Sequence, residues 1–309
     1  MKIFHSINDF RSAKKTILTL GTFDGVHMGH RKILEKVTQN TKNGEYESVV
    51  LTFFPHPRMV LQGESEVKLL NTLSEKIDLL EKIGIQNLVI HPFDETFSRL
   101  TAEEFVETVL VNQFHIQKII IGHDHRFGRN RTANIDDLIA FGVQHNFEVE
   151  QISVQEIDAV SISSTKIRTA LLTGNMALAN EFLGYDYFMS GTVLKGKQLG
   201  RTVGFPTANL QIDENYKLIP QNGVYVVKSI INQKTIFGMM NIGFNPTVAG
   251  KNLSIEIHFF NFDADLYDQK ISVSLLEYLR PEQKFDSIDL LKQQLVKDKN
   301  DALAYINSL

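Results

Sequence analysis

The sequence predicts two domains of different class. We expect an α/β domain over residues 1–184, with a parallel sheet covered by helices on both faces, and an antiparallel all-β domain over residues 185–309 that ends in a helix. The 309 residues are many for a single hydrophobic core. In the first part wholly apolar runs alternate with amphipathic stretches, whereas in the second part strand patterns follow one another directly.

The composition is typical of a folded globular protein, with 43% hydrophobic and 22% charged residues. The net charge of −4 argues against a protein built mainly to hold nucleic acid. The absence of cysteine excludes disulfides and thiolate chemistry. The first residues lack the apolar core of a signal peptide, and no apolar run is long enough to span a bilayer. We therefore expect a cytoplasmic protein without nucleic-acid or membrane partners, and the sequence leaves open whether it is a monomer or a homo-oligomer.

Apolar runs in the first part predict buried strands at residues 17–20, 48–53, 88–90, 118–122 and 147–152. Amphipathic patterns predict a helix that begins near Gly29, a helix over residues 74–83 that stops at Gly84, and a helix over residues 136–145. The stretch from Thr101 to Glu104 has the pattern of a capping box. Strands that are apolar throughout form parallel sheets, and the ligands of such sheets bind at the carboxyl ends of the strands.

Strand patterns in the second part cover residues 190–194, 223–231, 235–242, 253–260 and 270–276. Because these strands follow one another with only turns between them, they predict an antiparallel barrel or sandwich. Residues 287–309 then have the apolar stripe of an amphipathic helix that closes the chain.

A glycine-rich turn between a strand and a helix, residues 19–30, is the most informative stretch of the first part. This order of elements presents free backbone N–H groups and the positive end of a helix dipole to a phosphate. His27 and His30 are three residues apart, so both can project on one side of the helix start, and Gly29 leaves room for a phosphate. A zinc half-site and a solvated loop are the alternatives. With no cysteine and no His-Glu-x-x-His pattern, zinc is disfavoured.

Three other segments follow predicted strands or open a helix at the same edge of the sheet. Residues 53–57 place His56 between two prolines, which either stiffen a functional loop or only break the strand. Residues 121–131 contain two His, three Arg and two Gly, a composition that also suits a solvated basic loop. In residues 162–168 the hydroxyl side chains suit a plain helix N-cap, while Arg168 and a lysine add charge that can reach a polyphosphate.

Two stretches of the second part carry polar side chains suited to phosphate chemistry. Thr207 and Asn209 are two residues apart, so on an extended strand they face the same way, and their oxygens suit Mg²⁺ or phosphate. A turn with two neutral polar residues is the alternative. In residues 254–258, Glu256 and His258 lie on the face opposite the isoleucines. Glu256 is either an ordinary exposed residue or the carboxylate that receives a hydroxyl proton in a kinase reaction.

The glycine turn resembles the His-x-Gly-His signature of nucleotidyltransferases. More closely, it is similar to the Gly-x-Phe-Asp-Gly-Val-His-x-Gly-His form of prokaryotic bifunctional riboflavin kinase/FAD synthetases. The resemblance implies a Rossmann-like nucleotidyltransferase domain, in which His27, His30 and Arg168 act on the ATP phosphates. It further implies that the nucleotide and flavin are bound by Gly21, Phe23, Asp24, Gly25, Gly29, Pro55, His56, Asp124, Phe127, Gly128, Ser163, Ser164 and Thr165. Two positions depart from the family pattern: Phe54 stands where an acidic residue is common, and His125 replaces a phenylalanine.

The second part resembles the riboflavin kinases through Gly-x-x-x-Gly-Arg followed by Pro-Thr-Ala-Asn. The resemblance implies a riboflavin-kinase-like barrel in which Thr207 and Asn209 hold Mg-ATP and Glu256 is catalytic. It adds the binding residues Gly196, Gly200, Arg201, Pro206, Asn241 and Arg280. Residues 279–286 match the family's flap, which leads into the terminal helix and borders the flavin.

The function that the resemblance implies has two ATP-dependent steps. Riboflavin is phosphorylated to FMN in the second domain, and FMN is adenylylated to FAD with release of pyrophosphate in the first, with Mg²⁺ as cofactor. Adenylyl transfer needs no general base, because the attacking phosphate is already ionised at neutral pH, so positioning and charge neutralisation dominate. The alternatives are a chain with only one working activity, a flavin-binding regulator, and nucleotide transfer to another small phosphate. The last of these does not explain the Pro-Thr-Ala-Asn stretch or Glu256.

Overall fold

The computed structural model describes residues 1–61, 67–122, 126–153, 162–196, 200, 203–247 and 250–309. The internal contacts of the chain form two compact units, Met1–Ser163 and Ser164–Leu309, and each unit is described by itself. The α/β class of the first and the all-β class of the second confirm the predicted fold classes. The boundary between functional domains at residue 184 stays a prediction. Within the described residues, no helix is both long and apolar enough to cross a membrane.

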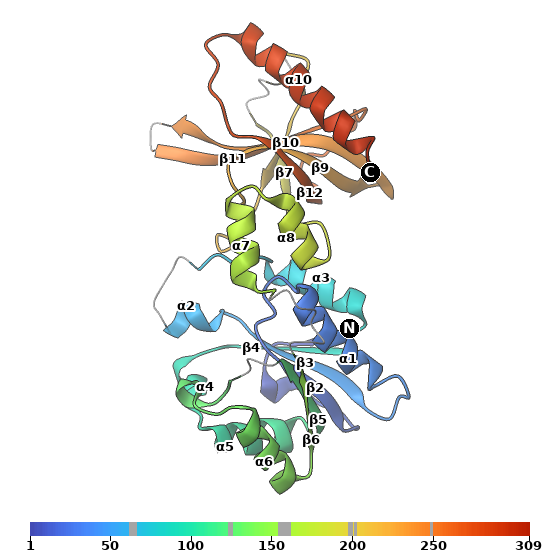
Figure 1. The fold of residues 1–309 in the computed structure, drawn as a ribbon, viewed down its shortest axis with the longest axis vertical. Coiled ribbons are helices and arrows are strands. Elements are labelled where there is room, and N and C mark those ends of the chain that lie inside the picture. Colours follow the sequence, from blue (N-terminus) through green and yellow to red (C-terminus); the bar gives the residue numbers. More distant parts are fainter. Residues whose placement is uncertain (62–66, 123–125, 154–161, 197–199, 201–202, 248–249) are drawn as a thin grey trace. The chain divides into compact units, whose positions relative to one another are not determined.

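The first unit is built on a parallel sheet (Figure 1). Its strands are β1 (Lys2–Phe4), β2 (Thr16–Leu20), β3 (Glu47–Phe53), β4 (Asn87–His91), β5 (Ile116–Gly122) and β6 (Glu148–Ile152). They lie in the order β1-β4-β3-β2-β5-β6, and every pair is parallel. The predicted strands are all present, while the short edge strand β1 was not predicted.

Helices connect these strands. The longer ones are α1 (Met28–Gln39), α3 (Leu73–Ile83), the π-helix η2 (Phe105–Gln113) and α6 (Ile135–His145). Shorter ones are η1 (Ile7–Asp9), α2 (Pro57–Leu61), α4 (Glu95–Ser98), α5 (Ala102–Glu104) and η3 (Arg129–Arg131). The helices α1, α3, α5 and α6 begin at residues whose side chains cap them. The predicted capping box of Thr101 and Glu104 is present, and Gly84 ends α3 in a left-handed conformation with φ of 92°.

Both faces of the sheet are covered by helices, as predicted (Figure 1). Successive residues of a strand point to opposite faces, so Leu18 and Ile17 on β2 belong to two different hydrophobic clusters. The cluster of Leu18 includes side chains of η2 and α6. The cluster of Ile17 includes Leu34 on α1 and Leu80 on α3. This double coverage explains why the strands are apolar throughout.

The order in which strands are added to the sheet reverses between β2 and β5. From β2 the chain passes to β3 and β4 on one side, and β5 and β6 lie on the other side. In open parallel sheets, ligands bind at such a switch point, outside the carboxyl ends of the strands. The glycine turn follows β2 and the loop that begins at Gly122 follows the adjacent β5, so both reach this end of the sheet.

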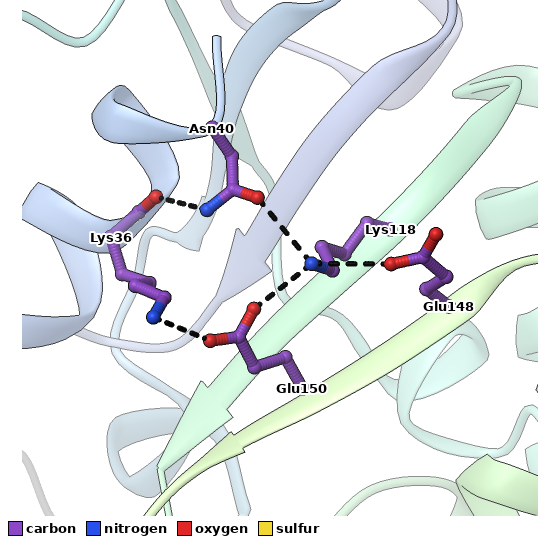
Figure 2. Close-up of polar contacts among 5 residues, drawn as sticks. All are labelled: Lys36, Asn40, Lys118, Glu148 and Glu150. Atoms are coloured by element: carbon purple, nitrogen blue, oxygen red, sulfur yellow. Dashed lines mark hydrogen bonds and ion pairs between the residues drawn. The ribbon is translucent and has the colours of Figure 1, made fainter.

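A network of ion pairs fastens the far end of α1 to the sheet (Figure 2). The Lys118 ammonium on β5 lies 3.1 Å from Glu148 and 3.0 Å from Glu150, both on β6, and also donates to the Asn40 side chain. Lys36 on α1 contacts Glu150 at 2.9 Å. Burial alone would lower the pKa of Lys118, but the two carboxylates outweigh it and raise that pKa. The network thus anchors the carboxyl end of the helix whose amino end follows the glycine turn.

The second unit contains a closed barrel. Its elements are α7 (Ser164–Leu172), α8 (Met176–Leu183), β7 (Phe188–Leu194), β8 (Ala208–Gln211), β9 (Gly223–Ile231), β10 (Lys234–Thr247), β11 (Gly250–Phe259), β12 (Lys270–Arg280) and α10 (Ile288–Ile306). The strand order β10-β11-β8-β7-β12-β9 is antiparallel throughout. The barrel alternative is therefore confirmed over the sandwich. Asn180 on α8 donates to the carbonyl of Leu275 on β12 at 3.0 Å, which ties the helix pair to the barrel.

The terminal helix α10 covers part of the barrel wall (Figure 1). Its apolar side chains Leu295, Ala302 and Leu303 pack in one cluster with Phe205 and with Met239 on β10. On β10, Met239 and Asn241 alternate with Met240 and Ile242, which point into the barrel. The face that α10 covers is therefore the outer face of the barrel. This outer face also carries the polar side chains predicted for the kinase site.

Candidate functional site

The turn after β2 has a strained backbone. Its predicted binding residues are Gly21, Phe23, Asp24 and Gly25, and it leads into Gly29 of α1. Phe23 and Val26 adopt left-handed conformations with φ of 46° and 37°, which are unfavourable for any residue with a Cβ and most of all for valine. Both side chains are buried, so core packing holds them in place. Such strain persists only where the surroundings over-determine the backbone, and it clusters at ligand-binding sites.

Two hydrogen bonds from neighbouring segments fix this turn. The Leu70 amide donates to the carboxylate of Asp24 at 2.8 Å. The ammonium of Lys76, in the first turn of α3, donates to the carbonyl of Thr22 at 2.7 Å. Asp24 and Lys76 are both buried at 3% exposure. The turn is therefore held through the residues on both sides of Phe23, by the buried Asp24 carboxylate and by the buried Lys76 ammonium at Thr22.

The two histidines meet at the start of α1. His27 is the N-cap residue, and its Nδ1 atom accepts a hydrogen bond from the backbone N–H of His30 at 3.3 Å. The proton of the neutral His27 ring therefore lies on Nε2. The two rings stack with their centroids 3.6 Å apart, and Phe23 packs edge-on against His30. The prediction that both side chains project on one side of the helix start is confirmed.

The electrostatics of this helix start suit an anion. Burial, His27 and Lys76 together lower the pKa of His30 well below its usual value, so His30 is neutral at pH 7. The buried Nδ1 atom of His30 has no hydrogen-bond partner among the residues that the structure describes. The first turn of α1 contains no acidic residue, so its own side chains leave the positive end of the helix dipole uncompensated. Neutral imidazoles and helix N–H groups can donate to phosphate oxygens without a separate cation.

The other predicted residues of this site lie at neighbouring strand ends. Pro55 and His56 follow β3, and the His56 Nδ1 atom accepts from the Arg58 amide at 3.1 Å. Phe127 follows β5 but is buried in the core against Phe105, and Gly128 adopts φ of 73°. A Cβ on Gly128 would come within 2.9 Å of the backbone of Ala102, so only glycine fits there. The buried position gives Phe127 a part in anchoring the loop, and its predicted contact with the nucleotide or flavin stays a prediction.

Several predicted positions lie elsewhere. Asp124, like His125, is outside the described residues. Ser163 is the last residue of the first unit, whereas Ser164, Thr165 and Arg168 are the first turns of α7 in the second unit. That the hydroxyl-rich segment opens a helix is confirmed, and its role toward ATP phosphates stays a prediction.

In the second unit the strand register aligns three polar residues of the predicted kinase site. Asn209 on β8 pairs with Glu256 on β11, and Asn241 on β10 pairs with the same Glu256 from the other side. Residues that pair directly across antiparallel strands project on the same face with Cβ atoms about 5 Å apart. Asn209, Glu256 and Asn241 therefore form a row across three strands on the outer wall of the barrel.

Hydroxyl groups orient the carboxylate of Glu256. Ser254 Oγ donates to Oε1 at 2.9 Å, and Thr207 Oγ1 donates to Oε2 at 3.3 Å. Both oxygens of Glu256 thus accept a hydrogen bond, and neither partner is a cation. The carboxylate remains half-exposed, so it can approach a substrate hydroxyl and accept its proton.

Two glycines before Thr207 lie close to their neighbours. A Cβ on Gly196 would lie 2.1 Å from the Asn209 side chain, and a Cβ on Gly200 would lie 2.2 Å from the carbonyl of Phe205. Gly200 is therefore required for its approach to the backbone, whereas a Cβ at position 196 would displace the Asn209 amide. Pro206 is exposed, and its carbonyl is 2.9 Å from Nδ1 of His258. Arg201 lies outside the described residues.

The donor set at this row fits Mg²⁺ bound together with a nucleotide. Thr207 and Asn209 supply a hydroxyl and an amide oxygen, which are hard neutral ligands, and nucleotide phosphates and water commonly complete the coordination of Mg²⁺. Gly196 provides the cradle that lets the Asn209 amide lie there. Within the described part of the chain, no group of three or more His, Asp or Glu side chains is arranged to hold a metal ion.

Arg280 has a contact that the sequence did not predict. Its Nε and Nη2 atoms donate to the two carboxylate oxygens of Asp298 on α10, at 2.8 and 2.6 Å. Asp298 is buried at 2% exposure and also accepts from Gln294. This bidentate pair fixes the end of β12 to the terminal helix, across the connecting residues 281–287. The role of Arg280 toward the flavin stays a prediction.

Sequence reasoning missed the residues that support the two sites from a distance. These are Lys76 beneath the glycine turn, Ser254 beside Glu256, and Asp298 opposite Arg280. For Ser254 a signal was present, because it lies two residues before Glu256 and so shares its face of the strand. For Lys76 and Asp298 the helical periodicity gave no such signal.

Comparison with known proteins matches two family models to successive parts of the chain. A family model described as FAD synthetase matches residues 9–166, and one described as riboflavin kinase matches residues 183–306. Two similar curated proteins are named bifunctional riboflavin kinase/FMN adenylyltransferase. The one from Listeria monocytogenes is 37% identical over 95% of this chain and 93% of its own length. The one from Buchnera aphidicola is 37% identical over 99% of both chains.

A solved structure is also similar over the full length. A crystal structure described as a macrolide-efflux protein from Streptococcus pneumoniae matches with a TM-score of 0.87 at 30% sequence identity. The match covers 96% of this chain and 97% of that one. The similarity therefore extends through both units rather than through one of them.

Proposed function

We propose that this chain, which belongs to the bifunctional riboflavin kinase/FMN adenylyltransferase family, carries out both reactions of that name. Riboflavin and ATP would give FMN and ADP in the barrel, and FMN and a second ATP would give FAD and pyrophosphate in the α/β unit. The observation that carries the proposal is a pair of sites, one in each unit. One holds the oriented carboxylate of Glu256, and the other holds His27 and His30 at the start of α1, whose first turn contains no acidic residue. The two donor sets suit two different phosphate reactions. We further propose that the protein works in the cytoplasm, where ATP is available.

For the kinase step we assign the proton acceptor to Glu256. The terminal hydroxyl of the ribityl chain attacks the γ-phosphorus of ATP, its proton passes to the Glu256 carboxylate, and ADP leaves. Ser254 and Thr207 hold that carboxylate in one orientation, which limits the rotation that would otherwise misdirect it. Thr207 and Asn209 would hold Mg²⁺, which when bound neutralises charge on the ATP phosphates.

For the adenylyl-transfer step we assign charge neutralisation rather than proton transfer. An ionised phosphate oxygen of FMN attacks the α-phosphorus of ATP, and pyrophosphate leaves. Donors from the two imidazoles and from the first turn of α1 would bind the phosphate oxygens as charge moves onto the leaving group. Ser164 and Arg168 are proposed to add a hydroxyl and a fixed charge to the same step.

A time course of flavin products tests the proposal. The full chain is incubated with riboflavin, ATP and Mg²⁺, and the flavins are separated at intervals. We expect FMN to form first and FAD to follow, with one pyrophosphate released per FAD. FMN that is never converted to FAD would leave only the kinase, and supplied FMN that is converted while riboflavin is untouched would leave only the adenylyltransferase. Tight flavin binding without ATP consumption would instead identify a regulator.

A further inference from the structure

A lysine is buried beneath the glycine turn without a role in the scheme above. Lys76 lies in the first turn of α3, only 3% exposed, and its ammonium donates to the carbonyl of Thr22 at 2.7 Å. Lysine is among the residues least often fully buried. An unbranched apolar side chain would fill the same volume without desolvating a charge. A buried ammonium at this position therefore calls for an explanation beyond packing.

The surroundings of Lys76 point toward the phosphate site. Its hydrogen bond reaches the residue immediately before Phe23, where the backbone turns left-handed. The carboxylate of Asp24 is near enough to raise the pKa of Lys76, and Lys76 is near enough to lower the pKa of His30. Lys76 thus acts on the turn through a hydrogen bond and on the helix start through its charge.

Keeping this cation in the fold is unfavourable for stability. Burial lowers the pKa of Lys76 to about 8, and Asp24 only partly restores it. Since the unfolded chain holds the same proton more tightly, the folded state is penalised at neutral pH. Groups held in such unfavourable states concentrate at functional sites.

We infer that Lys76 is a positioning residue for adenylyl transfer, whose buried ammonium holds the strained turn before α1 through the Thr22 carbonyl. The inference rests on the proposed function of the first unit. It assigns Lys76 no contact with substrate. Burial is the main cause of the lowered pKa of His30, and the positive charges of His27 and Lys76 add to it. The hydrogen bond to Thr22 fixes the turn and so keeps the backbone N–H groups at the start of α1 directed at the phosphate site.

The titratable groups on the elements around Lys76 define the expected pH dependence. They are Asp24 in the turn, the stacked His27 and His30 on α1, and Glu75 on α3, whose carboxylate is held by the Thr72 amide. Among these groups, His30 is the one whose pKa is lowered by the charge of Lys76. Removing the Lys76 charge raises the pKa of His30 and moves the acid limit of the reaction to higher pH.

The test uses the full chain with Lys76→Met and, as a matched control, Lys82→Met. Lys82 is an exposed lysine on the same helix, so the control makes the same chemical change without touching the turn. FAD formation from supplied FMN and ATP is measured between pH 5.5 and 9, together with riboflavin phosphorylation and the thermal midpoint of each variant. We expect Lys76→Met to lose about 10- to 100-fold in kcat for FAD formation. Its acid limb should move to higher pH, its kinase rate should equal that of the control, and its thermal midpoint should not fall.

A purely structural role for Lys76 predicts the opposite pattern. The thermal midpoint of Lys76→Met would fall, while FAD formation by the folded protein would keep the wild-type kcat and pH profile; either result overturns the inference. Lys76→Arg, which keeps the charge and the donors, should leave the acid limb at its wild-type position, and a shift equal to that of Lys76→Met would also overturn it. If the unmodified chain forms no FAD, the proposed function of the first unit fails, and with it the premise of this inference.

Discussion

Replacing Glu256 by glutamine tests the kinase site with little disturbance of the barrel. The substitution keeps the shape of the side chain and exchanges one carboxylate oxygen for an NH₂ group. Ser254 and Thr207 each donate to a different oxygen, at 2.9 and 3.3 Å, so one hydroxyl must rotate and become an acceptor. Because both hydroxyls can rotate, we expect a stability loss of no more than about 1 kcal/mol.

The expected loss of activity is much larger than this loss of stability. Removing a positioned proton acceptor typically lowers a rate about 10²- to 10⁴-fold, which corresponds to about 3 to 5 kcal/mol in the activation barrier. The loss should appear in kcat, since the hydroxyl proton is transferred only as the phosphoryl group moves. Formation of FAD from supplied FMN takes place in the other unit and should be unchanged.

The assay measures ADP formation with saturating riboflavin for the wild type, Glu256→Gln and Glu277→Gln. Glu277 lies half-buried on β12 of the same barrel and is a matched control for the loss of one carboxylate. We expect the control to keep its kinase rate and Glu256→Gln to lose it, with similar unfolding transitions for both. A Glu256→Gln variant that phosphorylates riboflavin at the wild-type rate would refute the assignment of the proton acceptor.

Three further predictions concern the supports of the fold. Because the pKa of His30 is lowered in the folded protein, the unfolded chain binds a proton first as the pH falls below about 6.5, and stability decreases by up to about 1.4 kcal/mol per pH unit. The thermal midpoint of His30→Gln should therefore fall less between pH 7.5 and 5.5 than that of the wild type; an equal fall would contradict the buried neutral state. Glu150→Gln should lower stability by about 1 kcal/mol at low salt and by less at high salt, measured by urea unfolding, since it breaks the partly exposed pairs with Lys118 and Lys36. Asp298→Ala leaves the Arg280 guanidinium without its buried partner and should cost about 3 kcal/mol in the unfolding of the barrel, whereas an unchanged transition would mean that the pair is dispensable.

Hydrophobic periodicity predicted the regular elements well because it reports directly on burial. The strand expected at residues 223–231 has those bounds in the structure, and the other expected elements differ only at their ends or in length. The largest difference is β10, which was expected to end at residue 242 but continues to Thr247. Its last residues pair with the start of β11 in a long hairpin that extends beyond the apolar pattern. The short edge strand β1 was missed for the same reason, since its residues are mostly exposed.

The residues of the candidate sites fall into two classes, those placed by local geometry and those placed by the packing of distant elements. Motifs of adjacent residues predicted the atoms nearest the expected ligands, because a turn or one face of a strand brings them together by local geometry. Thr207, Asn209 and Glu256 are in this class, and β-sheet register then aligns them with Asn241. The loop around Asp124 could not be compared, because it lies outside the described residues.

The supporting side chains belong to a different class, since their position depends on how distant elements pack. Lys76 is 54 positions from Thr22 along the chain, and Asp298 is 18 positions from Arg280. A helical pattern with one lysine or one aspartate on its buried face predicts only an imperfect helix. Packing places the Lys76 ammonium beneath the glycine turn in one unit and the Asp298 carboxylate beside the flap in the other. Substitution of Lys76 should therefore separate FAD formation from the stability of the fold, whereas substitution of Asp298 should lower that stability.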